Sequence, residues 1–281
     1  MPQYIGLLTD FGTRAGYVAS MKGVILSICS SCHIVDLSHE ITPQNVMEAA
    51  LFLENCSGYF PRGFIFLAVV DPGVGTNRKM LCLRTRSKGQ VFIAPDNGLL
   101  DLVMNAQGVD LLVSLVNKRY WLDATSQTFH GRDIMSPVAA HVAAGVDIAD
   151  LGPAMDPSSA AKLAMPPPSR VCEDGTITGA VLYLDMFGNV ITNVREEQLK
   201  AISAKVGDVL DVTFQGLHDP EHTTITVPLK RTYADVGRME FLCLVNSEGR
   251  FEIAVNQGSA GSKLGVFGGG HPIGVKRHAS R

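Results

Sequence analysis

The fold is decided by the segment Phe64-Ile-Phe-Leu-Ala-Val-Val70, which breaks directly into Asp71-Pro-Gly-Val-Gly-Thr-Asn-Arg78. An unbroken apolar run of this length, rich in β-branched and aromatic residues and ended by Pro and Gly, indicates a strand buried on both faces. Such strands belong to parallel sheets that helices cover on both sides. Ligands bind to these sheets in the crevice beyond the carboxyl ends of the strands. Asp71 and Arg78 are therefore the first candidates for chemistry.

On both sides of this segment, strand patterns alternate with helix patterns. Strands are predicted at residues 4–8, 34–36, 81–84, 91–94 and 111–115, and helices at 15–28, 43–55, 99–104 and 134–144. The helix at 43–55 has two start signals, because Thr42 can cap it and Pro43 suits its first position. Alternation of this kind is typical of βαβ units and predicts an α/β domain with a largely parallel sheet.

A change of composition marks the end of this domain. Residues 152–169 are rich in Pro, Ser and Ala, which favours an extended and fairly stiff connection. Short β-type segments then follow at 176–184, 209–213, 223–227, 241–245 and 251–255. They predict a smaller all-β, barrel-like domain. The expected organisation is an α/β domain over residues 1–152, a Pro-rich linker over 153–170 and a β-barrel domain over 171–281. The Gly-rich tail after Gly268 has no motif and is expected to be mobile.

The overall charge points to a small-molecule partner. The chain has 281 residues, and its 24 basic and 27 acidic residues give a net charge of -3 without long runs of either sign. This balance predicts neither nucleic-acid nor membrane binding. The N-terminus has no basic, apolar leader pattern, and no apolar run approaches the roughly 18 residues of a membrane span. We therefore expect a soluble, cytoplasmic protein.

The six cysteines are spread too thinly for a disulfide-stapled domain and are expected to be reduced. One cluster, Cys29-Ser-Ser-Cys32-His33, matches both a redox motif and a haem-attachment motif. No second pair of ligands stands at zinc-binding spacing. The favoured interpretation is the end of a helix followed by the start of a strand, with no function for Cys29 and Cys32.

Several acids and histidines stand at predicted strand ends and helix starts: Asp10, Asp36, His39, Asp71, Asp96, His130 and Asp133. Carboxylates and imidazoles that converge on one sheet edge can hold a divalent metal, so a metal-dependent hydrolase is one interpretation. The same residue types often only cap helices and close turns. Spacing alone leaves both interpretations open. The glycine patterns of a P-loop, a dinucleotide site and a nucleophile elbow are missing from the sequence.

Six motifs taken together resemble one family. They are Leu8-Thr-Asp10-Phe-Gly12 with Tyr17-Val-Ala-Ser-Met21-Lys-Gly23, Val70-Asp71-Pro-Gly-Val-Gly75 with Arg78, Pro95-Asp-Asn-Gly98, Phe129-His-Gly-Arg-Asp133, and Asp185-Met-Phe-Gly-Asn-Val-Ile-Thr-Asn193. In this order they resemble the S-adenosyl-L-methionine (SAM) hydroxide adenosyltransferases, which are adenosine-forming SAM hydrolases related to the SAM-dependent fluorinase and chlorinase. The resemblance runs from the first strand to Asn256.

The resemblance implies a homotrimer in which each SAM site lies between the N-terminal domain of one subunit and the C-terminal domain of the next. It implies that Asp10 binds the two ribose hydroxyls and that Asn189 binds the adenine edge. Asp185 and Ser247 would hold the methionine amine and carboxylate. Phe187 packs either on the adenine or in the barrel core. Glu248 stands where related enzymes carry a basic or small residue, which leaves the carboxylate contact in doubt.

The resemblance also implies that Asp71, Arg78 and His130 form the hydrolytic trio. Methionine leaves C5′ of the ribose as a neutral thioether, so the difficulty of the reaction lies in activating the attacking water. Arg78 can stabilise hydroxide character, His130 can accept a proton, and Asp71 can orient either partner. The trio could instead be an ion-pair network that braces the turn.

The expected reaction is hydrolysis of SAM to adenosine and L-methionine, with no cofactor and no metal. Halogenation by the same displacement is less favoured, because the hydrolytic signature around His130 is intact and residues 95–128 leave little room for an extra loop. Two other interpretations are a metal-dependent phosphoesterase and a non-catalytic module that binds SAM or adenosine. The remaining histidines are expected to be surface or packing residues: His33, His39, His141, His218, His222, His271 and His278.

Overall fold

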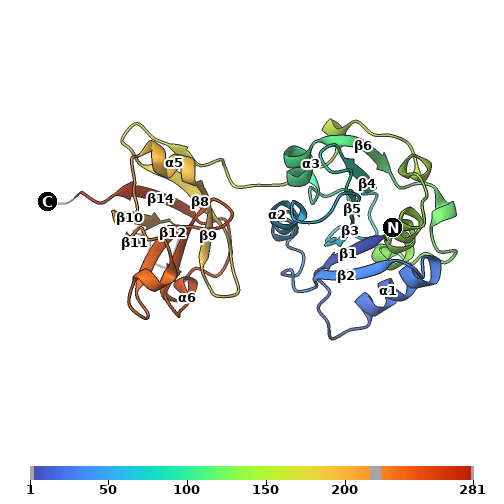
Figure 1. Ribbon diagram of the computed structural model, residues 1–281, viewed down its shortest axis with the longest axis horizontal. Helices are drawn as coiled ribbons and strands as arrows, with labels where there is room; N and C mark the ends of the chain where they lie inside the picture. The colour runs from blue at the N-terminus through green and yellow to red at the C-terminus, as the bar shows by residue number, and fades with distance from the viewer. Residues whose placement is uncertain (1–2, 216–222, 280–281) are drawn as a thin grey trace. The chain divides into compact units, whose positions relative to one another are not determined.

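A computed structural model describes residues 3–215 and 223–279, so His218 and His222 lie outside the described residues (Figure 1). The chain forms two compact units, Met1–Ala164 and Met165–Arg281. The division falls within the segment predicted as a linker, whose limits stay a prediction. The two-domain fold class, α/β followed by a β-barrel-like domain, is confirmed.

The N-terminal unit is built on a six-stranded sheet with the order β2-β1-β3-β5-β4-β6. Its strands are β1 (Tyr4–Thr9), β2 (His33–Ser38), β3 (Ile65–Val69), β4 (Met80–Thr85), β5 (Val91–Pro95) and β6 (Val109–Ser114). The strands β1, β2, β3 and β5 pair in parallel, whereas β4 is antiparallel to both of its neighbours. The sheet is therefore largely parallel but mixed, because the short connection from β4 to β5 can only make a hairpin.

Helices cover both faces of this sheet. They are α1 (Tyr17–Ile28), α2 (Val46–Ser57), α3 (Asp101–Gln107) and α4 (Ser136–Ala143). Leu67 of β3 belongs to the core on the side of α1 and α4, and Phe66 belongs to the core on the side of α2 and α3. Every residue of β3 is buried. The prediction of a strand buried on both faces is therefore confirmed.

The start of α2 differs from the prediction. The helix begins at Val46, and its cap is Asn45, whose Oδ1 accepts the N–H of Glu48 at 3.1 Å. Residues 42–45 instead form a turn in which the N–H of Asn45 donates to the carbonyl of Thr42 at 2.9 Å. Gln44 has a φ of 66°. A proline followed by a residue with positive φ is the pattern of a type II turn, so Pro43 closes this turn and does not start the helix.

A π-helical turn, η2 (Gly131–Met135), precedes α4 and continues into it. The hydroxyl of Ser136 donates to the carbonyl of Gly131 at 2.7 Å. The helix predicted at 134–144 is therefore divided between two kinds of helix. Turns of this kind occur mostly inside α-helices and frequently at functional sites.

The C-terminal unit is all antiparallel, with the order β11-β10-β14-β8-β9-β13-β12 and β7 paired to β8. A bridge between Leu229 and Cys243 joins the ends of the row and brings it close to a barrel. The strands are β7 (Arg170–Val171), β8 (Ile177–Leu184), β9 (Val190–Arg195), β10 (Val209–Phe214), β11 (Thr223–Pro228), β12 (Phe241–Val245), β13 (Arg250–Val255) and β14 (Pro272–Arg277). The helices of this unit are α5 (Glu196–Ala201) and α6 (Ala260–Leu264), with the short 3₁₀ helix η5 (Tyr233–Asp235). The 3₁₀ helices η1 (Lys118–Tyr120), η3 (Ile148–Leu151) and η4 (Pro157–Ser159) belong to the N-terminal unit.

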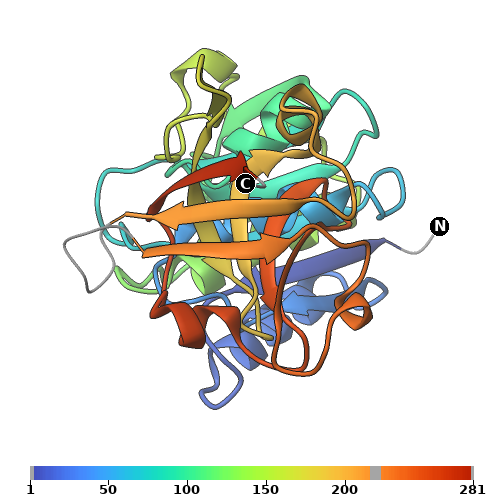
Figure 2. The same ribbon diagram turned by 90° about the vertical axis from the view of Figure 1, so that its left-hand side faces the viewer.

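The expectation of a mobile tail after Gly268 is wrong. Strand β14 lies inside the sheet between β10 and β8, and Figure 2 shows it in red beside the orange hairpin of β10 and β11. Ile273 and Val275 are buried in the barrel core, with Gly274 between them. Burial of alternate residues is the period of a strand with one face in the core. In the described ranges, no helix has both the length and the apolar character needed to cross a bilayer.

Candidate active site

Two predicted acids of the N-terminal unit follow neighbouring strands at one edge of the sheet. In the pairing of β1 with β3, Thr9 lies opposite Val69, and Asp10 and Asp71 follow these strands. Asn97 follows β5, and its side-chain Nδ2 donates to the carbonyl of Val70 at 2.9 Å. The turn that begins at Asp71 is thereby tied to the next strand of the sheet.

Asp71, Arg78 and His130 are in direct contact. The Nε of Arg78 donates to Asp71 Oδ1 at 2.6 Å, and its Nη2 donates to Asp71 Oδ2. The same Nη2 lies 3.3 Å from Nδ1 of His130. The side chains of Asp71 and Arg78 are only 5% and 9% exposed. Residues that are 52 positions apart in the chain thus form one buried, charged cluster.

Two glycines allow this contact. A Cβ on Gly131 would lie 3.0 Å from Cγ1 of Val69, so the turn that carries His130 packs directly against the end of β3. Gly75 has a φ of +83°, and a Cβ there would lie 2.9 Å from the carbonyl oxygen of Gln127. A larger residue at Gly75 or Gly131 would push the turn at 71–78 away from the loop that carries His130.

The geometry determines the protonation of the trio. A guanidinium has only donors, so Nδ1 of His130 accepts from Arg78 and the neutral ring carries its hydrogen on Nε2. Burial and the charge of Arg78 lower the pKa of His130 below its usual value of 6.5, against the opposing effects of Asp71 and Asp133. His130 is therefore neutral at pH 7. Nη1 of Arg78 is buried and has no hydrogen-bond partner among the described residues.

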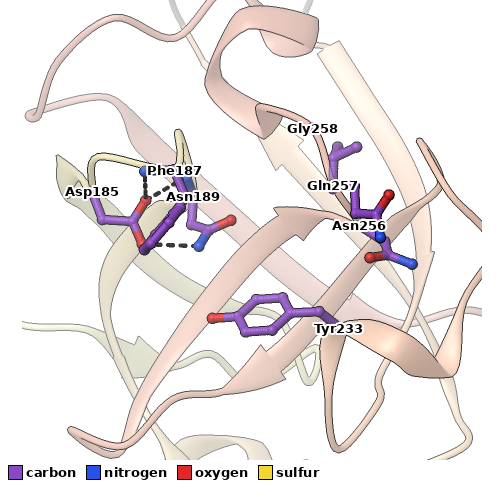
Figure 3. A pocket seen from close by; sticks show the side chains of 8 residues that line it. Asp185, Phe187, Asn189, Tyr233, Asn256, Gln257 and Gly258 are labelled. Carbon is purple, nitrogen blue, oxygen red and sulfur yellow. Dashed lines mark hydrogen bonds between the residues drawn. The ribbon is translucent and has the colours of Figure 1, made fainter.

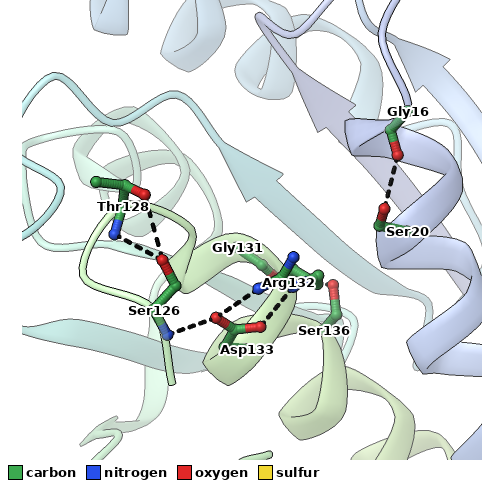
Figure 4. A network of polar contacts seen from close by, with 8 residues as sticks. All are labelled: Gly16, Ser20, Ser126, Thr128, Gly131, Arg132, Asp133 and Ser136. Carbon is green, nitrogen blue, oxygen red and sulfur yellow. Dashed lines mark hydrogen bonds and ion pairs between the residues drawn. The ribbon is translucent and has the colours of Figure 1, made fainter. Parts of the chain in front are cut away.

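Asp133 shapes the loop that carries His130 (Figure 4). Its buried carboxylate accepts the N–H of Ser126 at 2.7 Å and the Nε of Arg132 at 2.6 Å. The guanidinium of Arg132 lies 4.9 Å from the ring centroid of Phe129. Through these bonds to Ser126 and Arg132, Asp133 fixes the conformation of the loop that carries His130.

A second polar network lies beneath Asp10. The hydroxyl of Thr9 lies 2.9 Å from Nδ1 of His39, and Nε2 of His39 lies 3.0 Å from Oδ1 of Asp36. Lys22 donates to the other oxygen of Asp36 at 2.7 Å. Thr9 is fully buried and His39 is 5% exposed. The prediction that His39 is a packing residue is confirmed, because it anchors the end of β1.

Replacing His39 with leucine should lower the free energy of unfolding by about 1–3 kcal/mol, because the buried hydroxyl of Thr9 loses its acceptor. Leucine has a similar size, so lost packing contributes little. Urea unfolding of the variant measures this change. His33→Leu is the control, since His33 is exposed, and it should change stability by less than about 0.5 kcal/mol. Equal effects of both variants would contradict the role of His39.

Most of the acids and histidines that could have been metal ligands already form hydrogen bonds or ion pairs within the protein. Asp71 and His130 both bind Arg78, and Asp96 accepts the N–H of Ala161 at 2.8 Å. Over the ranges 3–215 and 223–279, no group of three or more His, Cys, Asp or Glu side chains is arranged to hold a metal ion. Asp96 therefore ties the end of β5 to the segment after η4.

The segment from Cys29 to His33 is the end of a helix followed by the start of a strand. Cys29 caps the C-terminal end of α1, and β2 begins at His33. Cys29 and Cys32 are both buried, and burial together with the neighbouring Cys29 raises the pKa of Cys32 to about 11. Thiols with raised pKa values are poor nucleophiles at neutral pH.

The C-terminal unit holds the other predicted residues in the turn between β8 and β9 (Figure 3). Oδ1 of Asp185 accepts the backbone N–H groups of Phe187 and Asn189, both at 2.9 Å. Oδ2 of Asp185 accepts from Nδ2 of Asn189 at 2.8 Å. Asp185 therefore orients the amide of Asn189, a role that the sequence did not indicate.

Phe187 is not part of the barrel core. Its side chain is 79% exposed, so the core alternative is wrong. It lines a cavity of about 600 Å³ together with Asp185, Asn189 and Tyr233. Three further lining residues follow β13: Asn256, Gln257 and Gly258. Tyr233 and these residues were missed from the sequence, although Asn256-Gln-Gly258 after a β-type segment is a recognisable turn signal.

A second cavity, of about 400 Å³, contains Ser247. Asp185 and Tyr233 line both cavities, so the two hollows are neighbours. The structure thus brings Asp185, Phe187 and Asn189 to the first cavity and Asp185 and Ser247 to the second. Asp185, which the resemblance assigns to the methionyl group, thus lies between Phe187 and Asn189 on one side and Ser247 on the other.

The fold and these residues define a two-domain protein with a cluster of polar side chains in each unit. The family model described as the SAM hydroxide adenosyltransferase N-terminal domain matches residues 5–152, and the model of the C-terminal domain matches residues 179–271. The chain therefore belongs to the SAM hydroxide adenosyltransferase family.

Individual relatives agree with this assignment. The chain is 38% identical over 95% of each chain to an (R)-S-adenosyl-L-methionine hydrolase of Salinispora tropica. It is 29% identical over 90% of each chain to a fluorinase of an Actinoplanes species. A crystal structure of an uncharacterized conserved protein from Thermotoga maritima has a TM-score of 0.88 and 37% identity, covering 97% of this chain and 100% of that one.

Proposed function

We propose that this protein hydrolyses SAM to adenosine and L-methionine. The observation that carries the proposal is the contact of Asp71, Arg78 and His130 at the carboxyl edge of the sheet. It is supported by relatives named (R)-S-adenosyl-L-methionine hydrolase, one at 38% identity and another, from Methanocaldococcus jannaschii, at 32%. The substrate itself supplies the leaving group, so the proposed reaction needs no cofactor.

The chemistry follows from the protonation of the trio. Nε2–H of His130 is a donor that can hold a hydroxide or a water in line with C5′, whereas Nη1 of Arg78 lies too deep for solvent to reach. Arg78 remains cationic and favours hydroxide character, while Asp71 fixes the guanidinium. Because Nε2 already carries hydrogen, this arrangement favours attack by hydroxide over removal of a proton by Nε2. The new C5′–O bond forms as the C5′–S bond breaks, and methionine leaves as a neutral thioether.

The substrate contacts belong to the same proposal. Asp10 accepts from the two ribose hydroxyls, Asn189 pairs with the adenine edge, and Phe187 packs on the adenine. Asp185 and Ser247 bind the methionyl group. Since these residues are divided between the two units, we propose a homotrimer in which the N-terminal unit of one subunit and the C-terminal unit of another complete each site.

The proposal predicts equimolar adenosine and methionine when the pure protein is incubated with SAM, and chromatography measures both. EDTA should leave the rate unchanged, and in H₂¹⁸O the label should enter the 5′-hydroxyl of adenosine. Loss of activity with EDTA would favour a metal-dependent enzyme. A 5′-halogenated adenosine, formed in the presence of halide, would favour a halogenase. Saturable binding of SAM without any product would contradict hydrolysis and favour a binding module.

A further inference from the structure

The cavity that contains Ser247 is rich in acids and has one cation. Its lining includes three carboxylates, those of Asp185, Glu248 and Glu252. Arg231 is the one cationic side chain among the described residues that line it. An amino-acid ligand carries both an ammonium and a carboxylate. The acids suit its ammonium, whereas its carboxylate would be repelled unless a positive charge lay close to it.

The acids are held in place by tyrosines. Glu252 is 2% exposed and accepts the hydroxyl of Tyr233 at 2.8 Å, and burial raises its pKa. Glu248 accepts the hydroxyl of Tyr183 at 3.3 Å. Figure 3 shows the Tyr233 hydroxyl on the side of its cavity where Asp185 lies. The side chains of Glu248 and Glu252 are therefore held in position in this wall, and Glu248 also lies 4.0 Å from Nε of Arg250.

Arg231 is held by its backbone and not by its side chain. The N–H groups of Arg231 and Thr232 donate to Oδ2 of Asp235 at 3.1 and 3.3 Å, at the start of η5. Among the described residues, the guanidinium of Arg231 has no hydrogen bond or ion pair, and the residue is exposed. Its donors are available to a ligand in the cavity.

We propose that Arg231 binds the α-carboxylate of the methionyl group of SAM and selects zwitterionic substrates. The proposal rests on the proposed function. The methionyl end of SAM has two positive groups, the sulfonium and the ammonium, and one negative group. This pattern matches a cavity with several acids and a single arginine. Related enzymes carry a basic or small residue where this chain has Glu248, and Arg231 supplies the positive charge from another position in the same cavity. Its planar guanidinium can bind a carboxylate through two hydrogen bonds.

The test compares SAM with decarboxylated SAM, which keeps the sulfonium and the amine but lacks the carboxylate. The wild-type protein should prefer SAM in kcat/KM by about 10- to 100-fold, the range for hydrogen bonds to charged groups. Arg231→Gln should lower kcat/KM for SAM by a similar factor. For decarboxylated SAM it should leave kcat/KM unchanged or raise it, because a repelling cation is removed. Arg231→Lys should recover part of the preference.

Arg238→Gln is the matched control, because Arg238 is exposed in the same segment but lines neither cavity. Arg238→Gln should leave kcat/KM unchanged for both SAM and decarboxylated SAM. Equal losses for both substrates in Arg231→Gln, or a wild-type protein without preference, would overturn the role of Arg231. Dissociation constants from calorimetry give the same comparison independently of turnover. A protein that binds SAM with this preference but forms no adenosine would refute the proposed hydrolysis and retain the role of Arg231.

Discussion

Replacing His130 with alanine is expected to lower kcat for SAM by about 10²- to 10³-fold, because one donor to the attacking oxygen is lost. The dissociation constant for SAM should change by less than about threefold, since the proposed substrate contacts lie elsewhere. Single-turnover chromatography measures the chemical step. Calorimetry with an aza analogue of SAM, which cannot be hydrolysed by this route, measures affinity. Matched losses of affinity and rate would contradict the role of His130.

His141→Ala is the control for this variant. His141 is also a half-buried histidine of the N-terminal unit, and burial and Arg119 lower its pKa as well. Its ring packs edge-on against Tyr120, with 5.2 Å between the ring centroids, and it is not part of the trio. The variant should keep kcat within about threefold of the wild-type value, so that a large effect of His130→Ala cannot come from the loss of any buried imidazole.

The pH dependence of the wild-type enzyme tests the same role. Protonation at Nδ1 would bring a second donor against Arg78 and break their contact. Because the pKa of His130 is lowered in the folded protein, breaking this contact should add a further fall in activity below pH 6.5, beyond the fall expected from the lower hydroxide concentration. The contribution of this group to stability is complete above its unfolded pKa of about 6.5 and is lost as the pH falls toward the folded value. A titration of the His130 ring above pH 6.5, followed by NMR, would contradict the neutral imidazole.

The sequence predicted the architecture well where one residue pattern decides it. The run from Phe64 to Val70 predicted β3, and its burial on both faces was confirmed. The direction of β4 was not predictable from its own residues, because it depends on the length of the connection to β5. Strand β14 was missed, since the glycines around Ile273 and Val275 resemble a mobile tail, whereas pairing on both sides holds them in the sheet.

The candidate site was less accessible to sequence patterns. Seven acids and histidines stood at predicted strand ends and helix starts. The buried strand before it made Asp71 a first candidate, but only the family resemblance joined His130 to it. The structure shows the physical difference, because Asp133 is saturated by its own loop whereas Arg78 retains a buried donor. The close approach that joins Arg78 to His130 depends on Gly75 and Gly131, and no periodic pattern records such a contact. Arg231 belongs to no motif and became a candidate only through its cavity.

Replacing Asp10 with alanine is expected to raise the dissociation constant for SAM by about 100-fold or more, because two charge-assisted hydrogen bonds to the ribose are lost. At saturating SAM, kcat should fall by less than about tenfold. Asp10 also has a structural contact, since its Oδ2 accepts the N–H of Gln44 at 2.8 Å. Part of the effect could therefore arise from the turn at 42–45.

Asp10→Asn separates these two effects, because the amide oxygen can still accept from Gln44 while the charge and one acceptor are lost. An intermediate loss of affinity, about tenfold, is expected for this variant. A SAM analogue without the 2′-hydroxyl should bind the wild-type protein more weakly, but Asp10→Ala should bind it as well as it binds SAM. If Asp10→Ala instead lowered kcat without changing affinity, Asp10 would act with Arg78 on the attacking water. The N-terminal unit would then carry only catalytic groups, and ribose recognition would have to come from other residues.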